Sequence, residues 1–293
     1  MPHAETSRPS ISVVIPTKDR AADLAQTLKC VLSQTRPPDE LIVVDQGCAG
    51  DACEVLAECA DLRPVHIRDS EIRGLPAARN VGFAASMGDL VCFLDDDVTL
   101  DPRYLSELER GFKLFPDWAG LTGRLTEEGC DPTRRALKAA LFRHRFLRDR
   151  RHALAWLKTA RAVPLLPGCA FCLRRAVLER FRFDEDLEGY ALGEDVDFFL
   201  RAGKVFSFGA IPSARAHHRR SSVGRAGGEK MSDAVKSSAR YLWARHRAGF
   251  VDDVAYFWFL LGFGLEAWLA RARVRLGSRP GLAAVIQDAA DSD

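Results

Sequence analysis

An apolar segment that runs directly into three consecutive aspartates constrains this chain more than any other feature. The segment covers residues 90–94, and the acids are Asp95, Asp96 and Asp97. Adjacent carboxylates repel one another and resist burial, so stability alone rarely places three of them at the end of a buried strand. A divalent cation removes this difficulty, because Mg²⁺ and Mn²⁺ prefer oxygen ligands and bridge carboxylates to phosphates. An acidic turn or a helix cap in solvent is the alternative interpretation.

Strand-like and helix-like segments alternate along the first hundred residues. Apolar runs predict strands at residues 11–15, 41–45, 65–67 and 90–94. Apolar residues at helical spacing predict helices that end near 34 and that cover 51–60 and 74–87. Such alternation is typical of an α/β fold, in which helices cover both faces of a mostly parallel sheet.

A Pro-Thr pair or acidic residues stand at the ends of three of the predicted strands. Pro16 and Thr17 follow the first strand, Asp45 ends the second, and Asp95–Asp97 follow the fourth. Ligands of open α/β sheets bind beside the carboxyl ends of the strands, near a switch in strand order. We therefore expect these polar residues to line one crevice, which favours a nucleotide site over an isolated acidic turn.

These motifs and several later ones resemble, in order and spacing, those of the family 2 glycosyltransferases, which have the GT-A fold. The resemblance covers residues 11–215 and is strongest in the first hundred. The matching segments are Val13–Thr17 with Arg20, Val43–Asp45, Gly74–Gly82, Gly88–Asp89, Phe93–Asp97, Gly168–Ala170 and Gly193–Asp197. The resemblance implies transfer of a sugar from a nucleotide-diphosphate donor, with inversion at the anomeric carbon.

The resemblance also implies roles for individual residues. Donor-binding residues would be Pro16, Thr17, Arg20, Asp45, Arg79, Asp95 and Asp96, with Asp45 near the base and Arg79 near the phosphates. Asp97 would bind the metal, Asp195 would be the general base, and Glu194 would position the base or the acceptor. Gln46–Gly47–Cys48 departs from the usual pattern after Asp45, which leaves the identity of the nucleotide open.

The chemistry of sugar transfer needs such groups. A diphosphate leaving group gains negative charge as the glycosidic bond breaks, and a divalent cation stabilises this charge as a Lewis acid. An acceptor hydroxyl becomes a good nucleophile when a carboxylate takes its proton during the attack. A base on the opposite side of the sugar from the diphosphate permits in-line displacement, and inversion follows from that geometry.

Two histidines follow the last expected strand, which covers residues 204–209. Many relatives carry a metal-binding or phosphate-facing histidine here, so we expect His217, ahead of His218, to bind the metal. A basic loop in solvent is the alternative.

The composition changes near residue 216. We expect a catalytic domain over residues 11–215 and a basic, aromatic, helical C-terminal extension over 216–293. The apolar run 254–270 fits a helix at a membrane interface, a helix buried within the protein or a homodimer, or a short membrane span. The basic segment 134–161 is expected to be helical. It suits a membrane surface or an anionic lipid-linked acceptor, and equally a solvated helix over the acceptor cleft.

Charge and cysteine content limit the partners and the compartment. A net charge of +2 predicts no nucleic-acid partner. The eight cysteines form no compact framework, and the N-terminal residues do not have the pattern of a secretory signal. We therefore expect reduced thiols in the cytoplasm, with peripheral attachment to the inner face of the plasma membrane as an extension. A saccharide or lipid-linked acceptor would place the protein in cell-surface polysaccharide or glycolipid synthesis.

Two other functions also fit an α/β fold with a nucleotide site. A metal-dependent nucleotidyltransferase usually has a glycine-rich loop and a lysine after the first strand, whereas residues 16–20 contain no glycine. A non-catalytic nucleotide-sugar-binding scaffold would not need both Asp97 and Asp195.

Overall fold

The computed structural model describes residues 8–47, 51–129, 154–187, 192–223 and 228–262. The strands are β1 (Ile11–Thr17), β2 (Glu40–Asp45), β3 (Val65–Arg68), β4 (Leu90–Leu94), β5 (Val98–Leu100), β6 (Trp118–Glu127), β7 (Arg161–Val163), β8 (Ala170–Arg174) and β9 (Ser207–His218). The helices are α1 (Ala21–Leu32), α2 (Asp51–Ala57), a short 3-10 helix (Ala60–Leu62), α3 (Gly74–Ala85), α4 (Tyr104–Leu114), α7 (Arg175–Arg180), α8 (Glu194–Ala202) and α9 (Gly228–His246).

The strands form one sheet with a parallel half and a mixed half. Their order is β3-β2-β1-β4-β8-β6-β9-β5, and β7 pairs with β9 outside this path. The strands β3, β2, β1 and β4 are parallel, as expected. Strand β8 is antiparallel to both β4 and β6, while β6 and β9 are parallel. The sheet is therefore more mixed than the sequence predicted.

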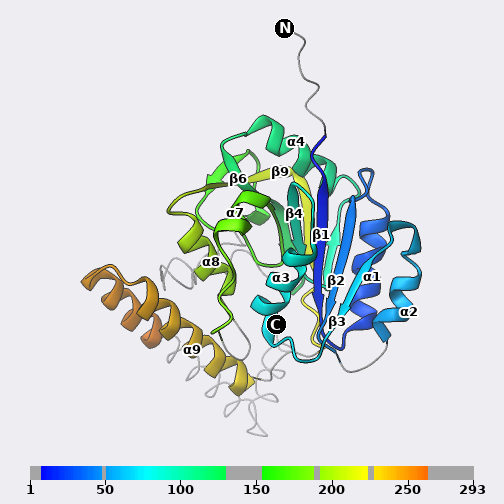
Figure 1. Ribbon diagram of the computed structural model, residues 1–293. Coiled ribbons are helices and arrows are strands. Elements are labelled where there is room, and N and C mark those ends of the chain that lie inside the picture. The colour runs from blue at the N-terminus through cyan, green and yellow to red at the C-terminus, as the bar shows by residue number, and fades with distance from the viewer. Residues whose placement is uncertain (1–7, 48–50, 130–153, 188–191, 224–227, 263–293) are drawn as a thin grey trace, which may run out of the picture.

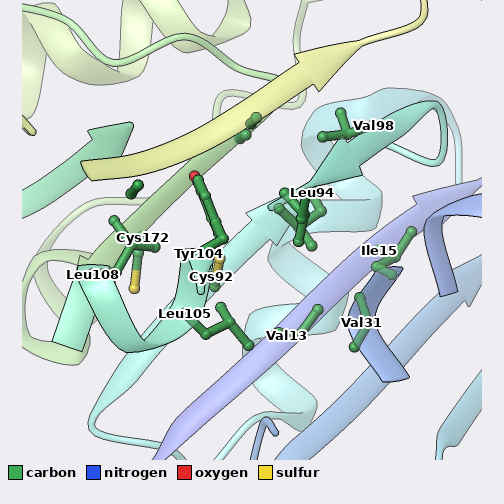
Figure 2. Packing of buried hydrophobic residues seen from close by; sticks show 14 of the residues in the cluster. Val13, Ile15, Val31, Cys92, Leu94, Val98, Tyr104, Leu105, Leu108 and Cys172 are labelled. Carbon is green, nitrogen blue, oxygen red and sulfur yellow. The ribbon is translucent and has the colours of Figure 1, made fainter. Parts of the chain in front are cut away.

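Helices cover both faces of the sheet (Figure 1). One hydrophobic core contains α1 and α4, where Val31 and Leu105 pack with Val13 of β1 (Figure 2). The other core lies on the opposite face, where Val14 packs with residues of α3, α7 and α8. Consecutive residues of β1 thus serve different cores, because side chains alternate across a strand. Burial on both faces explains why the strand sequences are almost entirely apolar.

Several segments differ from the sequence predictions. Strand β9 begins at Ser207, later than expected, and continues to His218, beyond the expected change at residue 216. Strand β5 was not predicted. The expected helix over 134–161 lies outside the described residues up to 153, and its last residue, Arg161, begins strand β7. Residues 250–262 are helical, and the rest of the apolar run 254–270 lies outside the described residues.

Within the part of the chain that the structure describes, no helix has both the length and the apolar character needed to cross a bilayer.

Candidate active site

The ends of β1, β2 and β4 bring the predicted polar residues to one edge of the sheet. Thr17 of β1 is in register with Asp45 of β2, and β4 runs parallel to β1 on its other side. Pro16 is buried opposite Val44 and contributes to the strand rather than presenting a polar side chain. The expected convergence of the strand ends is thus present in the structure.

The acids after β4 make direct contacts with β1 and with the residues that follow it. Thr17 Oγ1 donates a hydrogen bond of 2.8 Å to Asp96 Oδ2. Arg20 forms ion pairs with both acids, at 2.7 Å to Asp96 Oδ1 and 2.9 Å to Asp97 Oδ2. Both carboxylates are almost completely buried, so these partners offset the cost of removing the charges from water.

Thr27 of α1 holds the backbone of the acidic turn, a role that the sequence did not reveal. Its buried Oγ1 lies 2.6 Å from the carbonyl oxygen of Asp96 and 2.9 Å from that of Val98. The backbone N–H of Val98 in turn donates to the same Oγ1 at 3.2 Å. One hydroxyl therefore fixes the turn on both sides of Asp97.

Asp45 is buried at the end of β2. Its Oδ1 accepts a hydrogen bond of 2.8 Å from the backbone N–H of Gly47. Its Oδ2 lies 3.4 Å from Nε2 of His66 on β3, and among the described residues neither of these two atoms has a hydrogen-bond partner. A buried carboxylate oxygen that lacks a hydrogen bond is available to a donor group of a ligand.

Arg79 of α3 joins the two halves of the site. Its side chain is 1% exposed and lies between Phe171 and Phe183, with the guanidinium carbon 5.6 and 5.3 Å from the ring centres. Nη1 donates to Glu194 Oε1 at 2.7 Å, and Nη2 contacts Asp95 Oδ1 at 3.3 Å. Arg79 was expected to approach the nucleotide or its phosphates, and in the structure its buried guanidinium group contacts Glu194 and Asp95.

Gly168 connects Arg79 to Asp195. Its carbonyl oxygen accepts a hydrogen bond of 2.6 Å from Arg79 Nη2, and its N–H donates to Asp195 Oδ2 at 2.8 Å. A Cβ atom at this position would lie 3.0 Å from Asp195 Oδ2 and 3.1 Å from Glu194 Oε1. Glycine therefore permits the loop before β8 to approach both acids closely.

The three acids at the start of α8 have different surroundings. Glu194 is buried against Arg79, and Asp197 is fully buried against two arginines and a histidine. Asp195 lies between them in sequence and is only half-buried. Its carboxylate accepts hydrogen bonds from the backbone N–H groups of Gly168 and Val196 and forms none of the described ion pairs.

The structure brings His218, rather than His217, to the acids that follow β4, Asp95–Asp97, which we call the acidic cluster. His218 Nε2 lies 3.0 Å from Asp97 Oδ1, and its Nδ1 lies 3.5 Å from Glu127 Oε1. His217 instead lies with its Nδ1 2.9 Å from Thr126 Oγ1. His217, which the sequence favoured, therefore lies on another side of the strand from this contact, because both residues belong to β9 and neighbouring side chains of a strand point to opposite faces.

The loop after β9 also contacts the acidic cluster. The N–H of Ser221 donates to Asp97 Oδ2 at 3.0 Å, and Arg219 Nη2 contacts the carbonyl oxygens of Asp23 and Asp96 at 2.8 and 3.2 Å. Residues from the loop after β9 and residues of β1 therefore both contact the acids that follow β4.

The electrostatic environment gives neighbouring acids opposite pKa shifts. Burial, opposed by Arg20 and Thr17, raises the pKa of Asp96 to about 7. Burial also opposes the charge of Asp97, but hydrogen bonds from His218 and Arg20 hold its pKa well below its usual value. Burial and the adjacent Asp195 raise the pKa of Glu194 to about 7, although Arg79 acts in the opposite direction.

Three side chains of the cluster could together hold a cation. One ligand atom from each of Asp95, Asp97 and His218 can be chosen so that all three lie within 4.8 Å of one another. Two carboxylates and an imidazole suit Mn²⁺ and related divalent ions. Although burial opposes its charge, the pKa of His218 is raised to about 12 by its interactions with Asp97, Cys169 and Glu127, so a cation bound here would have to displace this proton.

Solved structures share this architecture. The mannosyltransferase PcManGT from Pyrobaculum calidifontis, in complex with GDP-Man and Mn²⁺, has a TM-score of 0.62 at 19% identity, covering 97% of this chain and 81% of that one. S. aureus TarS 1–349 in complex with UDP has a TM-score of 0.57 at 17% identity, covering 86% and 70%. The fold is that of the GT-A glycosyltransferases.

Sequence comparison identifies the family. The family model described as Glycosyl transferase family 2 matches residues 12–182, which is more than half of the chain. The chain belongs to the family 2 glycosyltransferases.

Curated relatives are similar over part of their length. A pre-mycofactocin glycosyltransferase from Mycobacterium tuberculosis is 29% identical over 228 residues, which cover 74% of this chain and 45% of the relative. A glucosyl-dolichyl phosphate glucuronosyltransferase from Haloferax volcanii is 30% identical over 122 residues, covering 40% and 39%. The chain thus spans less than half the length of these curated relatives.

Proposed function

We propose that this chain transfers a sugar from a nucleotide-diphosphate donor to an acceptor hydroxyl, with inversion and with a divalent cation. The observation that carries the proposal is the link through Arg79 and Gly168, which joins the acids after β4 to the half-buried Asp195 of α8. In this proposal, these hydrogen bonds connect the leaving-group site to the general base.

The donor would bind along the ends of β1, β2 and β4. Asp45 is suited to bind the nucleobase, because its buried Oδ2 accepts no hydrogen bond from the residues that the structure describes. Thr17, Arg20 and Asp96 would face the ribose and phosphates, while Pro16 shapes the strand end. Relatives with this fold have been solved with GDP-Man and with UDP. Guanine and uracil each carry a ring N–H group that can donate a hydrogen bond to a carboxylate. Donors that contain guanosine or uridine are therefore the first to test.

The cation would be held by Asp97 and His218, with Asp95 as a third ligand. When bound, it would supply the Lewis acid that stabilises the charge developing on the diphosphate. Arg20, at 2.9 Å from Asp97 Oδ2, would keep this carboxylate oriented and would add positive charge beside the leaving group. The predicted ligand His217 is replaced in this proposal by its neighbour.

Asp195 is the best candidate for the general base. Glu194 is committed to Arg79 by a hydrogen bond of 2.7 Å, and Asp197 is paired with basic groups and fully buried. Asp195 is half-buried, and in the described part of the chain its carboxylate accepts hydrogen bonds from the backbone N–H groups of Gly168 and Val196 and forms no ion pair. It can therefore accept the proton of an acceptor hydroxyl without first breaking an ion pair.

We propose a saccharide or lipid-linked acceptor and a role in cell-surface polysaccharide or glycolipid synthesis in the cytoplasm. The support is indirect. One relative is named for transfer to a dolichyl phosphate-linked sugar. Helical residues 250–262 expose Phe250, Val251, Val254 and Leu261, a surface that suits attachment to the inner face of the plasma membrane or a homodimer contact. In this proposal residues 216–293 form the extension that carries this surface.

The direct test is a screen of nucleotide sugars with and without Mn²⁺. Ligands that bind the native state raise its melting temperature by mass action, so the correct donor should stabilise the protein only with the cation present. Slow hydrolysis of that donor should accompany binding. Release of pyrophosphate from a nucleoside triphosphate would instead support a nucleotidyltransferase, and donor binding without any turnover would support a scaffold.

A further inference from the structure

We propose that helix α9 is a positioning element of the active site, which holds the first turn of α8 and with it the carboxylate of Asp195. The inference rests on the proposed role of Asp195 as the base. Helix α9 lies against α8 and extends away from the sheet (Figure 1). Three sets of contacts connect α9 either to α8 or to the segment that precedes α8 in the chain.

The first set surrounds Asp197, which has a fully buried side chain in the first turn of α8. Its neighbour on the same helix, Arg201, pairs with Oδ2 at 2.6 Å. The other oxygen, Oδ1, lies 2.8 Å from Nε2 of His246 and 3.2 Å from Nε of Arg245, both at the end of α9. Helix α9 therefore supplies two of the three charged partners described for Asp197, a carboxylate that could not remain buried and ionised alone.

The second set connects α9 to Asp184, in the segment that precedes α8. Tyr241 donates a hydrogen bond of 2.6 Å to Asp184 Oδ2, and Arg245 pairs with the same oxygen at 2.7 Å. Arg245 also donates to Tyr241 Oη at 2.9 Å. Arg245 thus bridges an acid on each side of the Glu194–Asp195 pair.

The third set is apolar and lies directly beside the pair. Gly193, which precedes α8, has a left-handed backbone conformation with φ of 88°. A Cβ atom there would lie 2.9 Å from Cδ1 of Leu242, a fully buried residue of α9. Helix α9 therefore touches the residue before Glu194 and, through Asp197, the second residue after Asp195. The two catalytic candidates are bracketed.

These contacts complement those from the sheet side. Arg79 and Gly168 hold Glu194 and Asp195 from inside, and α9 holds the same turn from outside. A carboxylate that takes a proton during displacement must be placed precisely, and small misplacements cost large factors in rate. The donor site lies at the ends of β1, β2 and β4, so loosening α9 should reduce turnover and leave donor affinity unchanged.

The test uses His246→Ala and Leu242→Ala in the full chain, with Arg240→Ala as a matched control on an exposed position of α9. Donor hydrolysis with Mn²⁺ gives kcat and the donor KM at a temperature well below each melting point. Amide hydrogen exchange of residues 193–199 reports the mobility of the first turn independently of any assay. Should His246→Ala fail to fold, Leu242→Ala and the milder His246→Gln provide the same comparison.

We expect kcat to fall about tenfold or more in both variants, with a donor KM within about twofold of the parent. Exchange in 193–199 should accelerate while β1 and β4 keep their protection, and Arg240→Ala should match the parent. Unchanged exchange and kcat, with only a lower melting temperature, would overturn the inference. A parent protein that hydrolyses no donor would refute the proposed function, while the exchange result would still decide whether α9 restrains α8.

Discussion

Arg79 Nη1 donates a hydrogen bond of 2.7 Å to Oε1 of Glu194, which joins residues 115 positions apart across the core of the protein. The same guanidinium group contacts Asp95 and the carbonyl oxygen of Gly168. One buried guanidinium group thus contacts both Asp95, which follows β4, and Glu194, which begins α8. The Arg79 side chain is 1% exposed and packed against two aromatic rings, and a hydrogen bond is stronger in such a low-dielectric environment than in water.

Replacement of Arg79 by methionine should strongly destabilise the protein. Glu194 would keep its buried carboxylate without a cationic partner, and breaking one side of a buried pair costs about 3–5 kcal/mol. Urea unfolding gives the change in free energy of unfolding. Arg110→Ala, which breaks an exposed pair with Glu107, is the matched control and should change it by about 0.5 kcal/mol or less. Equal effects of the two variants would contradict the structural role of Arg79.

The two histidines of β9 should differ in their effect on cation binding. His218→Ala removes an imidazole beside Asp97 and should weaken Mn²⁺-dependent donor binding by about tenfold or more. His217→Ala removes a contact with Thr126 and should leave donor binding unchanged. Calorimetric titration of the donor with and without Mn²⁺ measures both. A larger loss in His217→Ala would restore the assignment expected from the sequence.

Thr27→Val should weaken the acidic turn without changing its shape. The substitution replaces a hydroxyl that bonds Asp96 and Val98 with a methyl group of similar size. It leaves buried backbone groups unsatisfied, which costs about 1–3 kcal/mol. Urea unfolding should show this loss, and Mn²⁺-dependent donor binding should weaken as well. Parental values for both quantities would show that the turn holds itself without Thr27.

Asp197 should contribute a pH-dependent part of the stability. Burial opposes its charge, but hydrogen bonds from His246 and Arg201 lower its pKa below the ordinary value of 3.8. A carboxyl group whose pKa is lower in the folded state stabilises that state above its unfolded pKa, and the contribution is lost as the pH falls through the folded pKa. The stability advantage of the parent over Asp197→Asn should therefore be full at about pH 6 and smaller at about pH 3. Urea unfolding at both pH values measures it, and a constant difference would contradict the shift.

The sequence was sufficient for the parallel half of the fold because local patterns determine it. Apolar runs mark β1, β2 and β4, and parallel strands necessarily bring Thr17, Asp45 and the three aspartates to one edge. The family resemblance added the acids at the start of α8.

The remaining features depend on contacts between distant segments, which local patterns do not encode. The orientation of His218 depends on the extent of β9. The sequence predicted a strand over residues 204–209, whereas β9 covers Ser207–His218. The contact of Thr27 with Asp96 spans 69 positions, and that of His246 with Asp197 spans 49. A buried threonine or a histidine near a helix end is more often structural, so neither carried a signal in the sequence alone.

Comparison of Asp195→Asn with the parent tests the central proposal most directly. The amide keeps the size of the side chain and an acceptor for the N–H of Gly168, but it cannot take a proton from an acceptor. Both proteins are given Mn²⁺ and the nucleotide sugar that binds the parent. For Asp195→Asn we predict an unchanged donor affinity by calorimetry and a turnover lower than that of the parent by about a hundredfold or more. Turnover at the parental rate in Asp195→Asn would show that another group takes the proton, and would contradict the proposed mechanism.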